Sequence, residues 1–124
     1  MWEAFFDHYR LAVREARVVR VSLLLSVAVL VLHLILAFWF IVPRLGAPIF
    51  VLHYTVYFGP DQVGPAWQLL AAPGLGALIL LVNAALTAHF YVRNRWAGLF
   101  LSALSFFLQL LLAVSTFLIV LLNL

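Results

Sequence analysis

Three long apolar segments limit what this chain can fold into. Residues 21–42, 68–92 and 97–122 contain no Asp, Glu, Lys or Arg. A hydrocarbon core of about 30 Å is crossed by roughly 20 helical residues, so each segment is long enough to span it. The chain has 124 residues, of which 68% are hydrophobic and 9% charged. A small soluble domain could not bury so much apolar surface. We therefore predict an all-α membrane protein with one domain, residues 1–124, built as a bundle of three transmembrane helices.

The first 20 residues have a different pattern. Their apolar side chains recur at helical spacing: Trp2, Phe5, Phe6, Tyr9, Ala12, Val13 and Ala16. Charged side chains occupy the other face, and most of them are basic. This pattern predicts an amphipathic helix lying in the headgroup plane of a membrane. The alternative is a docking helix for a cytoplasmic partner.

The arginines predict an orientation. All seven basic residues are Arg; four precede residue 21, two lie between the second and third spans, and only Arg44 lies in the 43–67 loop. Arg and Lys gather on the cytoplasmic side of membrane proteins. We expect a multi-pass protein of a prokaryotic plasma (inner) membrane, with its N-terminus in the cytoplasm. The 43–67 loop and the C-terminus would then lie outside.

Polar residues within the apolar segments form the first candidate site. His33, Asn83 and Gln109 lie about 15–20 Å along their helices from the basic end, so we expect them in one broad layer. Small and hydroxyl residues continue the same helix faces. This pattern is typical of hydrogen bonds between membrane helices. The alternative is a path for a proton or solute. The predicted polar seam consists of His33, Asn83, Gln109, Ser26, Thr87 and Ser105.

Cofactor binding is a further alternative for the two histidines of the spans. Either His33 or His89 could act as a single axial ligand to a haem or a chlorophyll-type pigment. They lie at different depths, so one metal ion cannot bind both. The chain has no Cys, which excludes a thiolate metal site, and we expect no metal site. The expected bound molecules are membrane lipids.

The 43–67 loop is the one long segment without an apolar helical pattern. Residues 49–58 are rich in β-branched and aromatic side chains and alternate like a strand. The triplet Gly59-Pro60-Asp61 predicts a turn after this strand, and Gly64-Pro65 predicts a second turn. A single strand is not stable alone. We expect a short β-like extracytoplasmic loop that covers the bundle end or pairs with a strand of another chain.

The same loop carries a family resemblance. Its sequence VLHYTVYFGPD, residues 51–61, with Gly64, resembles the motif V-P-L-H-Y-N-x-Y-F-G-x-D-x-x-G of small three-span bacterial membrane proteins of unassigned function. This chain has Thr55 where the motif has Asn. The shared residues make the loop the expected recognition surface. Its candidate residues are His53, Tyr54, Gly59 and Asp61.

The sequence predicts a non-catalytic role. It contains no phosphate-binding loop, no nucleophile motif and no paired carboxylates, so we expect no enzyme activity. The net charge of +3 is too small and scattered for nucleic acid. We expect an accessory or scaffolding subunit of a larger membrane complex, or a bundle that self-associates. The alternatives are a transporter or channel component formed by oligomerisation, and a haem- or pigment-binding subunit.

Overall fold

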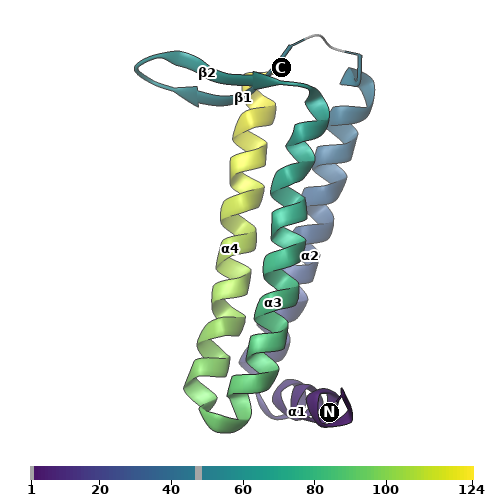
Figure 1. The fold of residues 1–124 in the computed structure, drawn as a ribbon, viewed down its shortest axis with the longest axis vertical. Coiled ribbons are helices and arrows are strands. Elements are labelled where there is room, and N and C mark those ends of the chain that lie inside the picture. Colours follow the sequence, from purple (N-terminus) through teal and green to yellow (C-terminus); the bar gives the residue numbers. More distant parts are fainter. Residues whose placement is uncertain (1, 47–48) are drawn as a thin grey trace.

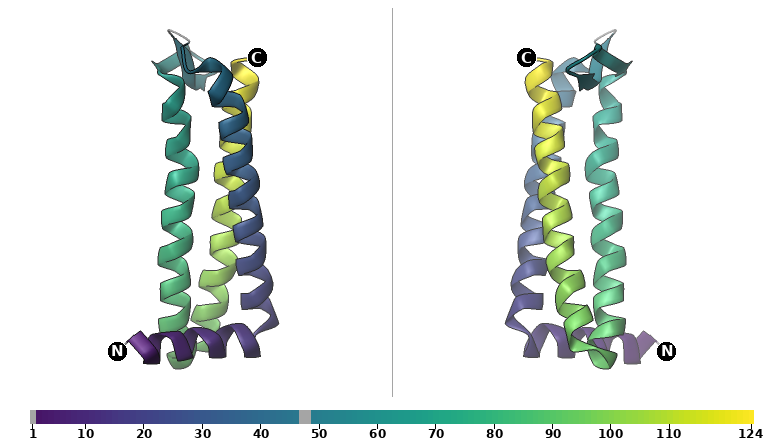
Figure 2. Two further views of the ribbon diagram at one scale, coloured as in Figure 1. Left: turned by 90° about the vertical axis from the view of Figure 1, so that its right-hand side faces the viewer. Right: turned by 90° about the vertical axis from the view of Figure 1, so that its left-hand side faces the viewer.

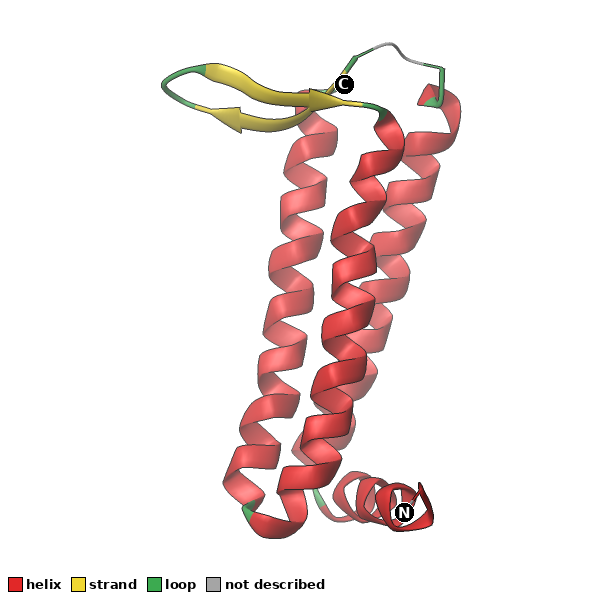
Figure 3. Ribbon diagram, viewed as in Figure 1, coloured by secondary structure: helices red, strands yellow, loops and turns green. Residues whose placement is uncertain are grey.

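The computed structural model describes residues 2–46 and 49–124, and its long helices run side by side as a three-helix bundle (Figure 1). The helices are α1 (Trp2–Glu15), α2 (Arg17–Ile41), α3 (Ala71–Arg93) and α4 (Arg95–Leu122). Short 3-10 helices cover Val42–Arg44 and Ala66–Leu70. Strands β1 (Phe50–Thr55) and β2 (Gly59–Gly64) form the only sheet among the described residues (Figure 3).

Three of the described helices are long and apolar enough to cross a membrane, as the sequence predicts. Their outward surfaces are apolar: Leu24 is 65% exposed, Leu32 65% and Leu81 69%. Their inward surfaces carry many of the polar side chains, including hydroxyl, amide and imidazole groups. This is the reverse of a water-soluble bundle, in which apolar side chains face inward. The distribution therefore suits a lipid solvent.

The first helix ends earlier than predicted. The amphipathic segment was expected over residues 1–20, but α1 ends at Glu15 and α2 already begins at Arg17. Between them Ala16 has extended backbone angles, φ −103° and ψ 103°. This one residue lets α1 lie across the end of the bundle while α2 runs along it (Figure 2). The basic residues Arg17 and Arg20 therefore belong to the long helix.

The second and third long helices form a tight antiparallel pair. Asn94 separates them, and its side-chain Oδ1 accepts hydrogen bonds from the backbone N–H groups of Trp96 (3.1 Å) and Ala97 (3.3 Å). This caps the N-terminus of α4. The two helices can approach each other closely because position 98 on α4 is glycine. A Cβ at this position would lie 2.9 Å from the Cα of Tyr91 on α3.

The loop differs from its prediction. The strand was expected over residues 49–58, with a turn at Gly59-Pro60-Asp61, but the chain reverses at 56–58 and residues 59–64 form β2. That turn prediction is wrong because Gly59, with φ 73°, completes the reversal and starts the returning strand. β1 thus pairs with β2 of its own chain. Register shifts after Val51 and His53 also interrupt the expected alternation.

Two apolar clusters lie at opposite ends of the bundle. At the hairpin end Phe40 and Phe50 pack edge to face, with ring centroids 5.6 Å apart. The other members are Ala37, Ile41, Ala66, Leu69 and Val120. At the α1 end the cluster consists of Ala12, Ala16, Val19, Leu23 and Tyr91. Between these clusters the interior is lined largely by polar and small residues.

Candidate functional site

All six side chains of the predicted polar seam are buried between α2, α3 and α4. Their exposure ranges from none to 8%. Helical periodicity explains this result, because residues seven apart return to nearly the same face. On α4 the buried residues Ser102, Gln109 and Thr116 follow this spacing. On α2 Ser26 and His33 do so as well.

The hydrogen bonds in the interior do not join His33, Asn83 and Gln109 to one another, although the sequence predicts these three side chains in one layer. His33 Nε2 lies 2.7 Å from Thr116 Oγ1, joining α2 to α4. Gln109 donates from Nε2 to the carbonyl oxygen of Gly76, 2.6 Å away, joining α4 to α3. Thr116 is seven residues beyond Gln109, about 10 Å along the helix. His33 and Gln109 therefore lie on separate levels of the bundle.

Gly76 is required by the second of these contacts. A Cβ at position 76 would lie 2.8 Å from Gln109 Oε1. The absence of a side chain lets the amide reach the backbone carbonyl, which is already an acceptor within α3. The sequence places Gly76 on the inward stripe of its helix, but only the structure identifies its partner.

Several buried polar atoms lack a hydrogen-bond partner among the described residues. They are His33 Nδ1, Asn83 Nδ2, Thr87 Oγ1, Tyr91 OH, Ser105 Oγ and Gln109 Oε1. Ser26, in contrast, donates to the carbonyl oxygen of Ser22 at 2.7 Å. Unpaired buried polar groups destabilise a fold unless something binds them. The interior of the bundle therefore contains several polar atoms that could still form hydrogen bonds, and they are spread along most of the length of the bundle.

The two candidate axial ligands are in different surroundings. His33 is 1% exposed and already contacts Thr116, whereas His89 is exposed on α3 and contacts the ring edge of Phe90. An open groove of about 320 Å³ between α2 and α4 includes His33 among otherwise apolar residues. Within the described chain no group of three or more His, Cys, Asp or Glu could hold a metal ion. Pigment binding through one histidine stays a prediction.

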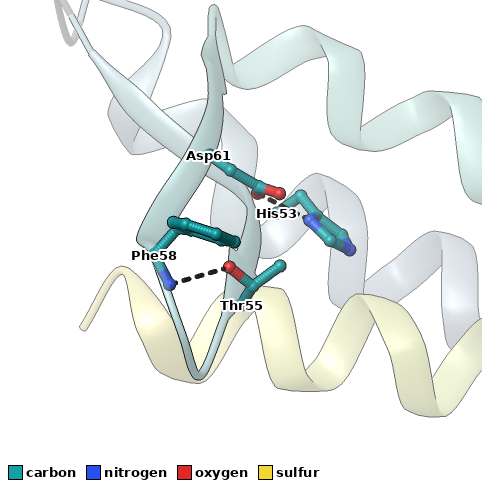
Figure 4. Close-up of polar contacts among 4 residues, drawn as sticks. All are labelled: His53, Thr55, Phe58 and Asp61. Carbon is teal, nitrogen blue, oxygen red and sulfur yellow. Dashed lines mark hydrogen bonds and ion pairs between the residues drawn. The ribbon is translucent and has the colours of Figure 1, made fainter.

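The predicted recognition residues lie on the β-hairpin, residues 50–64. His53 Nδ1 on β1 lies 2.6 Å from the carboxylate Oδ1 of Asp61 on β2, and the two side chains are 59% and 39% exposed (Figure 4). A carboxylate only accepts, so the imidazole donates. Tyr54 is paired with Pro60 in the strand register, and Gly59 begins β2. An exposed ion pair of this kind contributes little to the stability of the fold. Its main effect is to hold the His53 and Asp61 side chains together on the hairpin surface.

The tip of the hairpin was not among the predicted recognition residues. Val56, Tyr57 and Phe58 form the turn and are 89%, 91% and 86% exposed. Thr55 Oγ1 accepts a hydrogen bond from the Phe58 backbone N–H at 3.3 Å, which helps to close the turn (Figure 4). A continuous strand would place Tyr57 on the face opposite Val56 and Phe58. In the structure they stand together at the end of the hairpin.

Asn123 holds the hairpin to the bundle. Its Oδ1 accepts from the Val51 N–H at 2.9 Å, and its Nδ2 donates to the Val51 carbonyl oxygen at 2.7 Å. Nδ2 also contacts the Ile119 carbonyl oxygen at 2.8 Å. Sequence reasoning missed this residue. The signal was present, since Asn123 continues the seven-residue spacing of Ser102, Gln109 and Thr116 on α4.

A crevice of about 330 Å³ lies where the hairpin passes α4. β1 contributes Leu52, His53 and Tyr54 to this crevice. Residues 111–122 of α4 supply the opposite wall, which is apolar apart from Ser115. Figure 1 shows the hairpin extending sideways beyond α4, across the direction of the long helices. The hairpin therefore overhangs the outer surface of one helix.

No protein-family model, curated protein or solved structure matches the chain. The family resemblance of the loop motif accordingly stays a prediction.

Proposed function

We propose that this protein is a non-catalytic, multi-pass membrane protein that binds a neighbouring membrane protein, or a second copy of itself, through its hairpin. In this proposal it serves as an accessory or scaffolding subunit. The observation that carries the proposal is the position of the apolar tip Val56-Tyr57-Phe58. Contiguous exposed apolar residues typically mark interaction surfaces. Here they stand at the end of an arm that extends sideways from the bundle.

The direction of the hairpin favours a partner within the membrane plane. The three long helices lie side by side, so the membrane plane is perpendicular to them. The hairpin extends in that plane past α4 (Figure 1). A neighbouring transmembrane helix packed on α4 would lie beneath it, against Leu111, Leu118 and Leu122. Asn123 fixes the hairpin above this surface.

The proposed orientation follows from the charges at the two ends. The α1 end carries Arg10, Arg14, Arg17, Arg20, Arg93 and Arg95, whereas the hairpin end carries Arg44 alone. The positive-inside rule assigns the α1 end to the cytoplasm of a prokaryotic plasma membrane, with the hairpin and C-terminus outside. Exposed tryptophans near the helix ends suit the membrane interfaces: Trp39, Trp67 and Trp96 are 70%, 59% and 81% exposed.

A photocrosslinking amino acid tests the proposed contact. It is placed at Tyr57, and separately at Trp39 as an exposed aromatic control near the same end of the bundle, in cells that make the protein. We expect a discrete protein adduct from position 57 only. Replacing Val56, Tyr57 and Phe58 together by Ser should remove co-purifying protein while preserving the helix content measured by circular dichroism. Lipid adducts alone at position 57, with a monodisperse monomer after mild detergent extraction, would refute the proposal.

The buried polar atoms favour a second candidate, a component of a transporter or channel. Their row of unpaired groups could bind water or a small polar solute. Against an open path in a single chain, apolar clusters close this interior at both ends. Conduction would therefore need several copies or a rearranged bundle. Replacing His33, Asn83 and Gln109 by Leu should abolish flux in proteoliposomes if this candidate is correct. Absence of any flux through the unmodified protein would refute it.

A further inference from the structure

A crevice of about 360 Å³ lies where α1 meets α2, at the end of the molecule opposite the hairpin. Tyr9 and Val13 of α1 line one side. The other side consists of Arg20, Leu23, Leu24 and Val27 of α2. The crevice exists because the extended backbone at Ala16 sets α1 across the foot of α2, leaving an inside corner between them (Figure 2).

The lining changes from charged to apolar along α2. Arg20 is exposed in the first turn of α2 and lines the crevice together with Tyr9 and Val13 of α1. Val27 lies seven residues farther along, about 10 Å into the membrane if the helix spans it. Leu24 and Val27 are 65% and 48% exposed, so both can contact a molecule seated in the corner. A phospholipid has the same order of groups, with its phosphate at the headgroup level and its acyl chains deeper.

The charge of this end favours an anionic lipid. Six of the seven arginines lie here, against the three carboxylates Glu3, Asp7 and Glu15. The only ion pair found in residues 2–46 and 49–124 joins His53 to Asp61 on the hairpin, so Arg20 has no carboxylate partner. Arg17 lines a separate crevice of about 290 Å³ with Val18, Val21 and Ser22. Arg20 is therefore the guanidinium group that lines the corner itself.

We propose that the corner between α1 and α2 binds one anionic phospholipid of the leaflet in which α1 lies. Arg20 pairs with the phosphate, and the acyl chains pack on Leu24 and Val27. Tyr9 and Val13 close the corner from the α1 side. This inference rests on the membrane location proposed above and is independent of any partner at the hairpin.

Native mass spectrometry of the full chain in detergent tests the site. The probes are phosphatidylglycerol and phosphatidylcholine with identical acyl chains. We expect tighter binding of phosphatidylglycerol, and a loss of about fivefold with Arg20→Gln, since one basic residue near a lipid surface contributes about that factor. Arg44→Gln at the opposite end removes the same charge and should leave the affinity unchanged. Val27→Trp fills the apolar part of the corner and should weaken both lipids.

The outcomes distinguish a specific lipid site in the corner from a general attraction between anionic lipids and the arginines of the protein. Equal losses for Arg20→Gln and Arg44→Gln, or no preference between the two lipids, would overturn the proposal. Retained phosphatidylglycerol binding in Val27→Trp would place the lipid elsewhere on the basic face and would also overturn it. Failure of the membrane location itself has a different signature, namely protein recovered in the soluble fraction without detergent.

Discussion

Removal of the Asn123 side chain should weaken the attachment of the hairpin to the bundle without unfolding the bundle. Asn123→Ala removes both hydrogen bonds to Val51, at 2.9 and 2.7 Å. A net value of about 0.5–1.5 kcal/mol for each bond gives about 1–3 kcal/mol in total. The equilibrium for opening at Val51 should therefore shift by about 5- to 150-fold. The long helices keep their packing because the substitution lies at the end of α4.

Hydrogen–deuterium exchange of the protein in lipid nanodiscs measures this shift. The Val51 amide should exchange faster by the stated factor, while amides in the middle of α2, α3 and α4 keep their rates. Asn94→Ala is the matched control, because it removes two hydrogen bonds to backbone amides at the other end of α4. An unchanged Val51 rate in Asn123→Ala, or an equal acceleration in Asn94→Ala, would refute the assignment of Asn123 as the hairpin's attachment.

Two further predictions concern the bundle interior and are tested by thermal unfolding in detergent. Gly76→Ala should lower the free energy of unfolding by about 1–3 kcal/mol, because the added Cβ would displace the Gln109 side chain and leave a buried polar group unpaired. Gly74→Ala, which meets no atom within 4 Å, is the control for helix propensity, and equal effects would contradict the proposed contact. His33→Leu and Thr116→Val should be coupled by about 0.6–2 kcal/mol in a double-mutant cycle, whereas additive effects would show that their hydrogen bond contributes nothing.

The hairpin could be predicted from the sequence only in part. A strand at Phe50 to Thr55 follows from alternation and β-branched residues, and the structure contains it. The position of the reversal does not follow, because Gly59-Pro60-Asp61 is typical of turns and yet lies in β2. Both strands gain their stability from each other and from α4. The pairing of β1 with β2, and the choice of Val51 as the partner of Asn123, 72 residues away, are not encoded in any local pattern.

The three long apolar helices, the concentration of arginine at one end and the inward faces of His33, Asn83 and Gln109 could all be predicted from the amino-acid pattern. These properties depend on composition and on the helical period, which act within one segment. The contacts of His33 with Thr116 and of Gln109 with Gly76 could not be predicted in this way, because hydrogen-bond partners depend on the axial position of one helix against another. That position is set by contacts along the whole bundle, including the close approach at Gly98. The pairing of the hairpin and its attachment through Asn123 were decided in the same way.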